Sequence, residues 1–318
     1  MKVLPIKLYF SLIFFFLGCS ESNRITQPET TSPTVKYTAG EIYSDTQNNV
    51  EFRFGNTPFI IIVPHDGSTE PTTIPDRTGN IDRAINTRKA AEQLAYFLNG
   101  FSGGKFPHMI VNNLHRSKMD PDLSLTEGAQ GNSYATQAYT TFHKFIQTAV
   151  DSIEQQHDSA VLINLIGHNH DIQRIELGFL LSGSQLSLSD SELNNLSSVS
   201  SIAQISSYSS NSFSDIIRGV TSIGNKLKDT TYTSDYVTYS FDVVPSESTP
   251  NPGDNPYNSG GYIVDRYGSQ NGGKINSIEI SSPFVGHRDS ANSYRALGYI
   301  ILESVKLFYE ANSGNSLY

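Results

Sequence analysis

Two histidine-bearing segments have the residue types and spacing that suit metal or acid/base chemistry. Residues 59–67 read FIIIVPHDG, an apolar run that ends at a proline just before His65, and residues 160–171 read AVLINLIGHNHD, which places His168 and His170 just after a second apolar run. Short runs rich in Ile and Val, closed by Gly or Pro, are typical of strands buried on both faces. Because sites in open α/β sheets form at the carboxyl ends of strands, we expect these histidines to share one site.

Carboxylates follow both histidine segments closely. Asp66, Glu70 and Asp76 come after the first segment, and Asp171 and Glu176 come after the second. These acids favour a metal or acid/base site. A histidine at a strand end is, however, often a hydrogen-bonded structural residue. Chain position alone leaves both interpretations open.

Residues 1–18 have the layout of a bacterial lipoprotein signal peptide. Lys2 and Lys7 precede an apolar block that is shorter than the roughly 20 residues of a membrane-spanning helix. The block ends in Phe16-Leu17-Gly18-Cys19, which resembles a lipobox, although leucine is usual where Phe16 stands. We therefore predict that Cys19, the chain's single cysteine, is lipidated; the alternative is a chance cysteine.

The remaining chain is predicted to be a tether and one domain in the bacterial cell envelope. Residues 19–36 are polar and rich in Pro, Thr and Ser, as in a disordered tether, and residues 37–318 form the domain. We expect a lipid anchor to a membrane, with the domain facing the periplasm or the cell exterior. The formal net charge of −9 argues against nucleic acid as a partner.

The order of the predicted elements indicates an α/β domain. Apolar runs predict strands, helical spacing predicts helices, and their alternation favours a mostly parallel sheet with helices on both faces. The serine-rich stretch 186–208 keeps a three-residue apolar spacing and is predicted to be a surface helix, and 245–261 is predicted to be a long loop near a site or a disordered insert. The predicted strands are 50–55, 59–63, 109–111, 160–167, 174–183 and 274–281, and the predicted helices are 86–98, 134–153, 186–208, 213–228 and 291–309.

A series of segments in this order resembles the N-formylglutamate amidohydrolase family. The segments are VPHDG, IPDR, NNLHRSKMD, GHNHD followed by QRIELGFLL, and SIEIS, and the resemblance runs from about residue 59 to residue 289. It implies the fold of the zinc carboxypeptidases, a three-layer α/β/α sandwich with a mixed, mostly parallel central sheet. It also implies metal-dependent hydrolysis of an amide bond in a small acidic substrate.

The resemblance implies a zinc ion with a general base beside it. Zinc held by two histidines and a carboxylate lowers the pKa of a bound water and polarises the amide carbonyl. The expected ligands are His65, His168 and a carboxylate from the loop after His65, Glu70 before Asp76. Glu279 is the expected general base.

Three arginines lie inside the matching segments and are expected to bind the substrate. A guanidinium grips a carboxylate with two parallel hydrogen bonds, which suits an acidic ligand. Arg77, Arg116 and Arg174 are the candidates, and Arg116 is the first choice.

Several positions depart from the family pattern. Where relatives read D-x-H-G-H-G-H, this chain has Asn164 for the aspartate and Ile166 for the first histidine. Tyr267 replaces the histidine of R-H-G-S, and Ser281 replaces the usual carboxylate of the late strand.

Two of these losses have a possible replacement two residues away. Glu279 lies on the same strand face as Ser281, and His168 on that of Ile166 if the chain stays extended. A two-residue shift moves a side chain by roughly 6.5 Å, which is large for a metal shell. We therefore keep two hypotheses: a zinc amidohydrolase acting on an N-acylated or γ-linked acidic amino acid or peptide, and a catalytically degenerate lipoprotein that binds such a ligand in the same cleft.

Overall fold

The computed structural model describes residues 36–318, so the predicted signal peptide and Cys19 lie outside the described part. The chain divides into two units, Met1–Lys36 and Tyr37–Tyr318. All helices and strands described below belong to the second unit. Within the described range, no helix combines the length and the apolar character needed to cross a bilayer.

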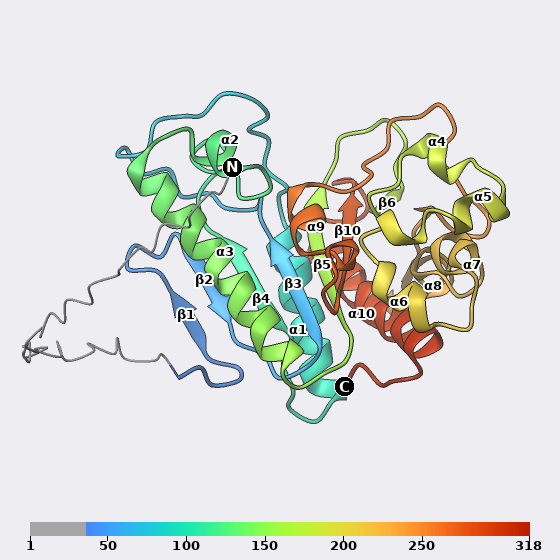
Figure 1. The fold of residues 1–318 in the computed structure, drawn as a ribbon. Coiled ribbons are helices and arrows are strands. Elements are labelled where there is room, and N and C mark those ends of the chain that lie inside the picture. Colours follow the sequence, from blue (N-terminus) through green and yellow to red (C-terminus); the bar gives the residue numbers. More distant parts are fainter. Residues whose placement is uncertain (1–35) are drawn as a thin grey trace, which may run out of the picture. The chain divides into compact units, whose positions relative to one another are not determined.

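The second unit is built on a mixed sheet of eight strands in the order β1-β2-β4-β3-β5-β10-β6-β9 (Figure 1). The pairs β4–β3, β3–β5, β5–β10 and β6–β9 are parallel, and the other neighbours are antiparallel. This confirms the predicted α/β fold with a mixed, mostly parallel central sheet. The strands are β1 (Ile42–Ser44), β2 (Val50–Arg53), β3 (Phe59–Val63), β4 (His108–Asn112), β5 (Ala160–Gly167), β6 (Ile175–Gly178), β9 (Val243–Val244) and β10 (Ile275–Ser282).

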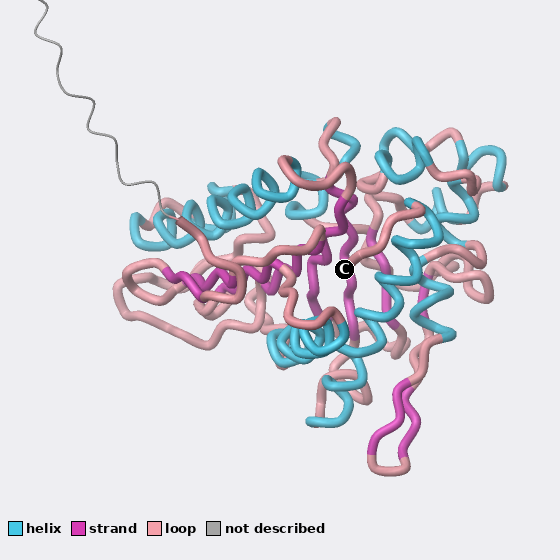
Figure 2. Tube along the Cα trace, turned by 90° about the horizontal axis from the view of Figure 1, so that it is seen from below, coloured by secondary structure: helices cyan, strands magenta, loops and turns pink. Residues whose placement is uncertain are grey.

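Helices cover both faces of the sheet, because its central strands are apolar on both sides. On β3, Ile60 and Ile62 belong to one core cluster with α3 (Ser133–Glu154), while Ile61 belongs to the other, with α1 (Thr87–Phe101) and α10 (Ala291–Ser313). Helix α9 (Tyr262–Tyr267) joins α3 on the first face. Figure 2 shows the helices on either side of the sheet. The three layers leave the carboxyl ends of β3, β5 and β10 side by side at one edge.

The prediction of one helix over 186–208 is wrong. The segment forms α5 (Asp190–Asn194), η1 (Ser197–Val199) and α6 (Ala203–Tyr208), separated by turns. Serine explains the breaks: the Ser189 hydroxyl and the Glu192 carboxylate form a capping box that starts a new short helix, because serine side chains compete for the backbone groups of a continuing helix. Of the regularly spaced apolar residues, Leu193 and Ile202 are buried in the core, whereas Val199 is 51% exposed.

The prediction of one helix over 213–228 is also wrong. The chain forms α7 (Phe213–Arg218) and α8 (Ile223–Asp229). Gly219 is extended at the end of α7, and the Ser222 hydroxyl accepts a hydrogen bond from Asn225 N at 3.0 Å to start α8. Helix α8 packs against α10 and β9, and α7 packs against α5 and α8.

Two further predictions concern the loop 245–261 and the strand expected over 174–183. Residues 245–261 form no helix or strand, and the end of this loop lines a cavity. The strand expected over 174–183 is shorter, since Leu180 takes a positive φ of 63° just after β6. Additional short elements are α2 (Leu125–Ala129), α4 (Gly183–Leu186), η2 (Ser269–Asn271) and the hairpin of β7 (Tyr232–Ser234) and β8 (Val237–Tyr239).

Candidate active site

A polar cavity of about 350 Å³ opens at the carboxyl ends of β3, β5 and β10. His65 follows β3, Ile166 and Gly167 end β5, and Glu279 lies on β10. The loop after β4 supplies Arg116. This cavity is the place where the sequence predicts a shared site. Its other lining residues are Asn80, Asp122, Tyr257, Asn258, Ser259, Gly260 and Gly261.

Two buried carboxylates face this cavity and share one amide. Asn164 and Glu279 are register partners on the parallel strands β5 and β10, so their side chains leave the same face of the sheet. Asn164 Nδ2 donates to Asp122 Oδ2 at 3.0 Å and contacts Glu279 Oε2 at 3.4 Å. Burial and the nearby Asp122 carboxylate raise the pKa of Glu279 to about 8, and burial also raises the pKa of Asp122. The pair therefore holds a proton near neutral pH.

The loop 257–261 closes over these carboxylates. Gly261 N donates to Glu279 Oε2 at 2.9 Å. Asn258 N donates to Glu176 Oε2, and Asn258 Nδ2 to the Ser281 hydroxyl, both at 2.8 Å. Gly178 permits this approach, since a Cβ there would lie 2.4 Å from Gly260 N.

His65 is held by a further buried carboxylate, Asp120. Its Nε2 lies 2.8 Å from Asp120 Oδ1, while Arg77 Nη2 and Arg116 Nε bind Asp120 Oδ2 at 3.0 and 2.8 Å. Burial alone would raise the pKa of Asp120, but His65 and Arg116 hold that pKa well below its usual range. Asp120 thus fixes the His65 ring through one nitrogen and leaves Nδ1 available.

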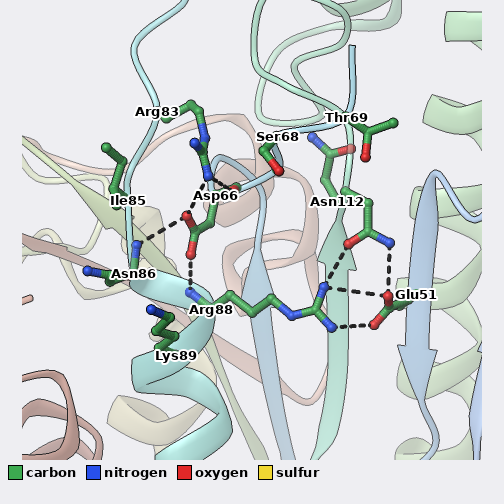
Figure 3. Close-up of a pocket in the computed structure, with 12 residues that line it drawn as sticks. Glu51, Asp66, Ser68, Thr69, Arg83, Ile85, Asn86, Arg88, Lys89 and Asn112 are labelled. Carbon is green, nitrogen blue, oxygen red and sulfur yellow. Dashed lines mark hydrogen bonds and ion pairs between the residues drawn. The ribbon is translucent and has the colours of Figure 1, made fainter. Parts of the chain in front are cut away.

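Asp66, the residue after His65, attaches the loop after β3 to the start of α1 (Figure 3). Its carboxylate accepts hydrogen bonds from Asn86 N at 3.1 Å and Arg88 N at 2.8 Å, at the start of α1. Arg88 in turn pairs with Glu51 on β2 at 2.7 Å. These hydrogen bonds and ion pairs connect the loop after β3 to α1 and β2.

A separate cluster of His168, His170 and Glu176 could hold a metal ion. One ligand atom from each residue lies within 4.8 Å of the others, and this is the one such group found within residues 36–318. His168 Nε2 lies 2.9 Å from Arg174 O, a backbone contact of the kind that orients a metal-binding histidine, and His168 Nδ1 accepts a hydrogen bond from His170 N at 3.2 Å. His170 Nδ1 lies 3.0 Å from Glu176 Oε1. A metal ion bound by all three residues would take the place of the hydrogen bonds at these two Nδ1 atoms. One side-chain nitrogen from each histidine and a carboxylate make an N2O donor set, which suits zinc.

The predicted zinc shell of His65, Glu70 and His168 is not assembled as one group. Glu70 is exposed, with its nearest charged partner His115 at 4.0 Å, and it lines none of the cavities described here. Ile166, which cannot bind a metal, lines the cavity beside His65. The residues around His65 therefore do not fit a two-histidine zinc shell, whereas the His168 cluster does.

The three predicted arginines differ in what they bind. Arg77 is buried, and its guanidinium is used internally by Asp120 and by the carbonyls of Arg116, Thr78 and Asn80. Arg174 is also buried, 3.8 Å from Glu176. Arg116 lines the cavity at the ends of β3, β5 and β10 and an adjoining cavity of about 270 Å³. Of the three, Arg116 is placed to meet a ligand.

Sequence reasoning missed the two aspartates that organise the site. Asp120 ends the segment LHRSKMD and Asp122 follows it, and neither was singled out. The signal was available, since both acids follow β4 at the same sheet edge as His65. His170 was noticed in the sequence but not assigned a role.

The fold, rather than the sequence, connects this chain to known proteins. No family model matches it, and no curated protein matches it. Its structure is similar to the crystal structure of N-formylglutamate amidohydrolase from Ralstonia eutropha JMP134, with a TM-score of 0.50, 10% identity, and coverage of 84% of this chain and 99% of that chain. A gene product from Agrobacterium tumefaciens is less similar, with a TM-score of 0.43, 10% identity, and coverage of 82% and 95%. The first likeness supports the α/β fold described above.

Proposed function

We propose that the domain hydrolyses the amide bond of a small acidic substrate in the cavity at the ends of β3, β5 and β10. The substrate class is an N-acylated or γ-linked acidic amino acid or peptide. The observation that carries this proposal is the pair of buried carboxylates, Asp122 and Glu279, bridged by the Asn164 amide and facing a polar cavity with Arg116. The fold's likeness to an amidohydrolase and the sequence resemblance support the same reaction class.

The pair supplies both proton transfers of amide hydrolysis. With one proton between them, the ionised carboxylate takes a proton from the attacking water, and the protonated carboxyl gives its proton to the amide nitrogen as the C–N bond breaks. The products are a carboxylic acid and an amine. Because the pKa of Glu279 is raised to about 8, Glu279 enters the reaction protonated, as the acid, and takes the base role once it has lost that proton.

Arg116 orients the acidic substrate. Its Nε is bound to Asp120, which leaves Nη2 without a hydrogen-bond partner among residues 36–318. A substrate carboxylate that pairs with this guanidinium would be held in the same cavity as the two carboxyl groups.

Zinc is the metal we propose for His168, His170 and Glu176. Zinc bound there would supply a Lewis acid and a water of lowered pKa. His168 would bind through Nδ1, in place of the hydrogen bond from His170 N, while Arg174 O holds its Nε2 and Asn258 N holds Glu176. The acid/base steps above rest on the chain's own carboxyl groups.

A second candidate function is binding without hydrolysis, and Ile166 favours it. This side chain lines the cavity where the resemblance expects a metal-binding histidine, and Asn164 stands where an aspartate is expected. Either function is compatible with the proposed attachment through Cys19 to the bacterial cell envelope.

The two candidates are separated by turnover and ligand-induced stability measured on the same protein. The purified protein, with and without zinc, is incubated with N-formyl-, N-acetyl- and γ-glutamyl amides, and product amine is quantified. Hydrolysis of any of these supports the enzyme. No hydrolysis, together with a melting temperature raised by N-acetyl-glutamate, supports the binding protein. No hydrolysis and no shift contradict both.

A further inference from the structure

We propose that the cleft continues into an apolar subsite that takes an aliphatic acyl chain of the ligand. This inference rests on the proposed acidic-amide ligand and specifies its second half. The subsite is a hollow of about 490 Å³, a size within the range of small-molecule sites. Its apolar wall is made by Ile81, Ile85 and Phe284.

These three side chains remain in contact with water around one hollow. Ile81 is 42% exposed, Ile85 44% and Phe284 37%. Single exposed apolar residues are ordinary, but several that line one concavity mark a binding site. They come from two segments far apart in the sequence, the loop before α1 and the loop after β10.

Arg288 fixes both walls of the hollow relative to each other. Its guanidinium donates to the carbonyl of Ile85 on one side and to those of Pro283 and Ser282, at 3.2 and 3.0 Å, on the other. The same guanidinium lies 5.8 Å from the centre of the Phe284 ring. Because Arg288 is itself buried, the hollow is a built feature of the fold.

The hollow is continuous with the cavity at the ends of β3, β5 and β10, which we call the catalytic cavity. Asp82, Arg83, Asn169 and Arg288 line both the hollow and the adjoining cavity that contains His168 and His170. That cavity in turn shares Asn80, Arg116, Gly167 and Asn258 with the catalytic cavity. A ligand whose carboxylate binds Arg116 can therefore extend an apolar chain past Arg83 to Phe284.

The test measures affinity against acyl-chain length. N-acetyl-, N-butanoyl-, N-hexanoyl- and N-octanoyl-glutamate are titrated into the Glu279→Gln protein, where turnover does not consume the ligand. We expect the dissociation constant to fall about fourfold for each methylene that becomes buried. Phe284→Ser and Ile85→Thr should flatten this dependence, while Val285→Ser, a change of a 65% exposed neighbour outside the hollow, should leave it intact.

The outcomes separate this proposal from the proposed function. An affinity that does not depend on chain length, or a dependence that survives in Phe284→Ser and Ile85→Thr, overturns the subsite even where wild-type protein hydrolyses acetyl-glutamate. A chain-length dependence lost in these two variants upholds the subsite even where wild-type protein hydrolyses none of the four ligands. Absence of binding by all four overturns it as well.

Discussion

Asn164 determines how the two carboxylates of the cavity behave, because its amide nitrogen lies between them. An aspartate at this position, as the sequence resemblance expects, would place a third negative charge in a buried group. The neutral amide instead donates to both acids, and its own Oδ1 is buried without a partner in the described part of the chain. With a neutral amide at position 164, the site contains two carboxyl groups, Asp122 and Glu279, that share one proton.

The raised pKa of Glu279 predicts a pH-dependent effect of Glu279→Gln on stability. The folded protein keeps the proton up to about pH 8, whereas the unfolded chain releases it near the ordinary value of 4.5. Wild-type stability therefore falls as pH rises between these values. Since glutamine mimics the protonated form, the variant should gain on the order of 4 kcal/mol over wild type at pH 8 and almost nothing at pH 4.5.

This prediction is checked by denaturant unfolding of both proteins across that pH range. Glu247→Gln, a change of an exposed carboxylate, is the control and should give a difference that does not vary with pH. A Glu279→Gln difference that is equally flat would mean that Glu279 is ionised in the folded protein.

Replacing Arg77 by lysine should mainly lower stability, whereas replacing Arg116 by lysine should mainly lower ligand affinity. Arg77 is buried with its guanidinium used by Asp120 and three carbonyls, so Arg77→Lys should cost about 2–4 kcal/mol of stability. Arg116→Lys should lower the affinity for N-acetyl-glutamate about tenfold or more with a smaller loss of stability, because a lysine cannot make the paired hydrogen bonds. Melting temperatures and calorimetric titrations measure both. A stability loss confined to Arg116→Lys would reverse these assignments.

Among the elements, the turn between β5 and β6 contains the metal site that we propose. His168 and His170 follow β5, and Glu176 lies on β6, antiparallel to β10. Glu176 is the register partner of Ser281, so a carboxylate on the neighbouring strand stands beside the position where the family carboxylate is missing. The proposed metal ligands thus come from the end of β5 and from β6.

Zinc binding should therefore depend on His170 and not on Glu70. We expect His170→Ala to weaken zinc at least about 100-fold, as loss of one ligand from a three-residue shell does, while Glu70→Gln and His115→Ala leave it unchanged. His115 is the matched control, since it is also partly exposed beside a carboxylate. Competition with a chromophoric chelator gives the affinities, and the visible spectrum of the cobalt protein reports the geometry. Zinc lost in Glu70→Gln would restore the shell predicted from the sequence.

Strand ends were predictable from the sequence, but the loops that complete the site were not. The apolar runs before His65 and His168 identify β3 and β5, and the run around Glu279 identifies β10, because buried central strands leave a strong pattern. Asp120 and Gly261 come from irregular segments whose path depends on contacts such as Gly178 against Gly260. Such contacts leave no periodic trace in the sequence.

For the whole molecule, the proposed attachment to the cell envelope depends on Cys19, which lies outside the described residues. Cys19→Ala should move the protein from the membrane fraction to the soluble fraction, because it removes the proposed site of lipidation. No apolar stretch after residue 19 approaches the length of a membrane span. Fractionation of cells expressing both proteins, followed by immunoblotting, gives the distribution. An unchanged membrane fraction for Cys19→Ala would rule out anchoring through this cysteine.

In the proposed mechanism a proton shared by two carboxyl groups drives amide hydrolysis, and the pH profile of kcat/KM for N-acyl-glutamate tests this step. We expect a bell-shaped wild-type profile whose alkaline limb falls near pH 8, where Glu279 loses its proton. Glu279→Gln should lower kcat about 100-fold or more while binding of the acidic ligand persists. Full activity in Glu279→Gln, or a wild-type rate that keeps rising well above pH 8, would contradict it.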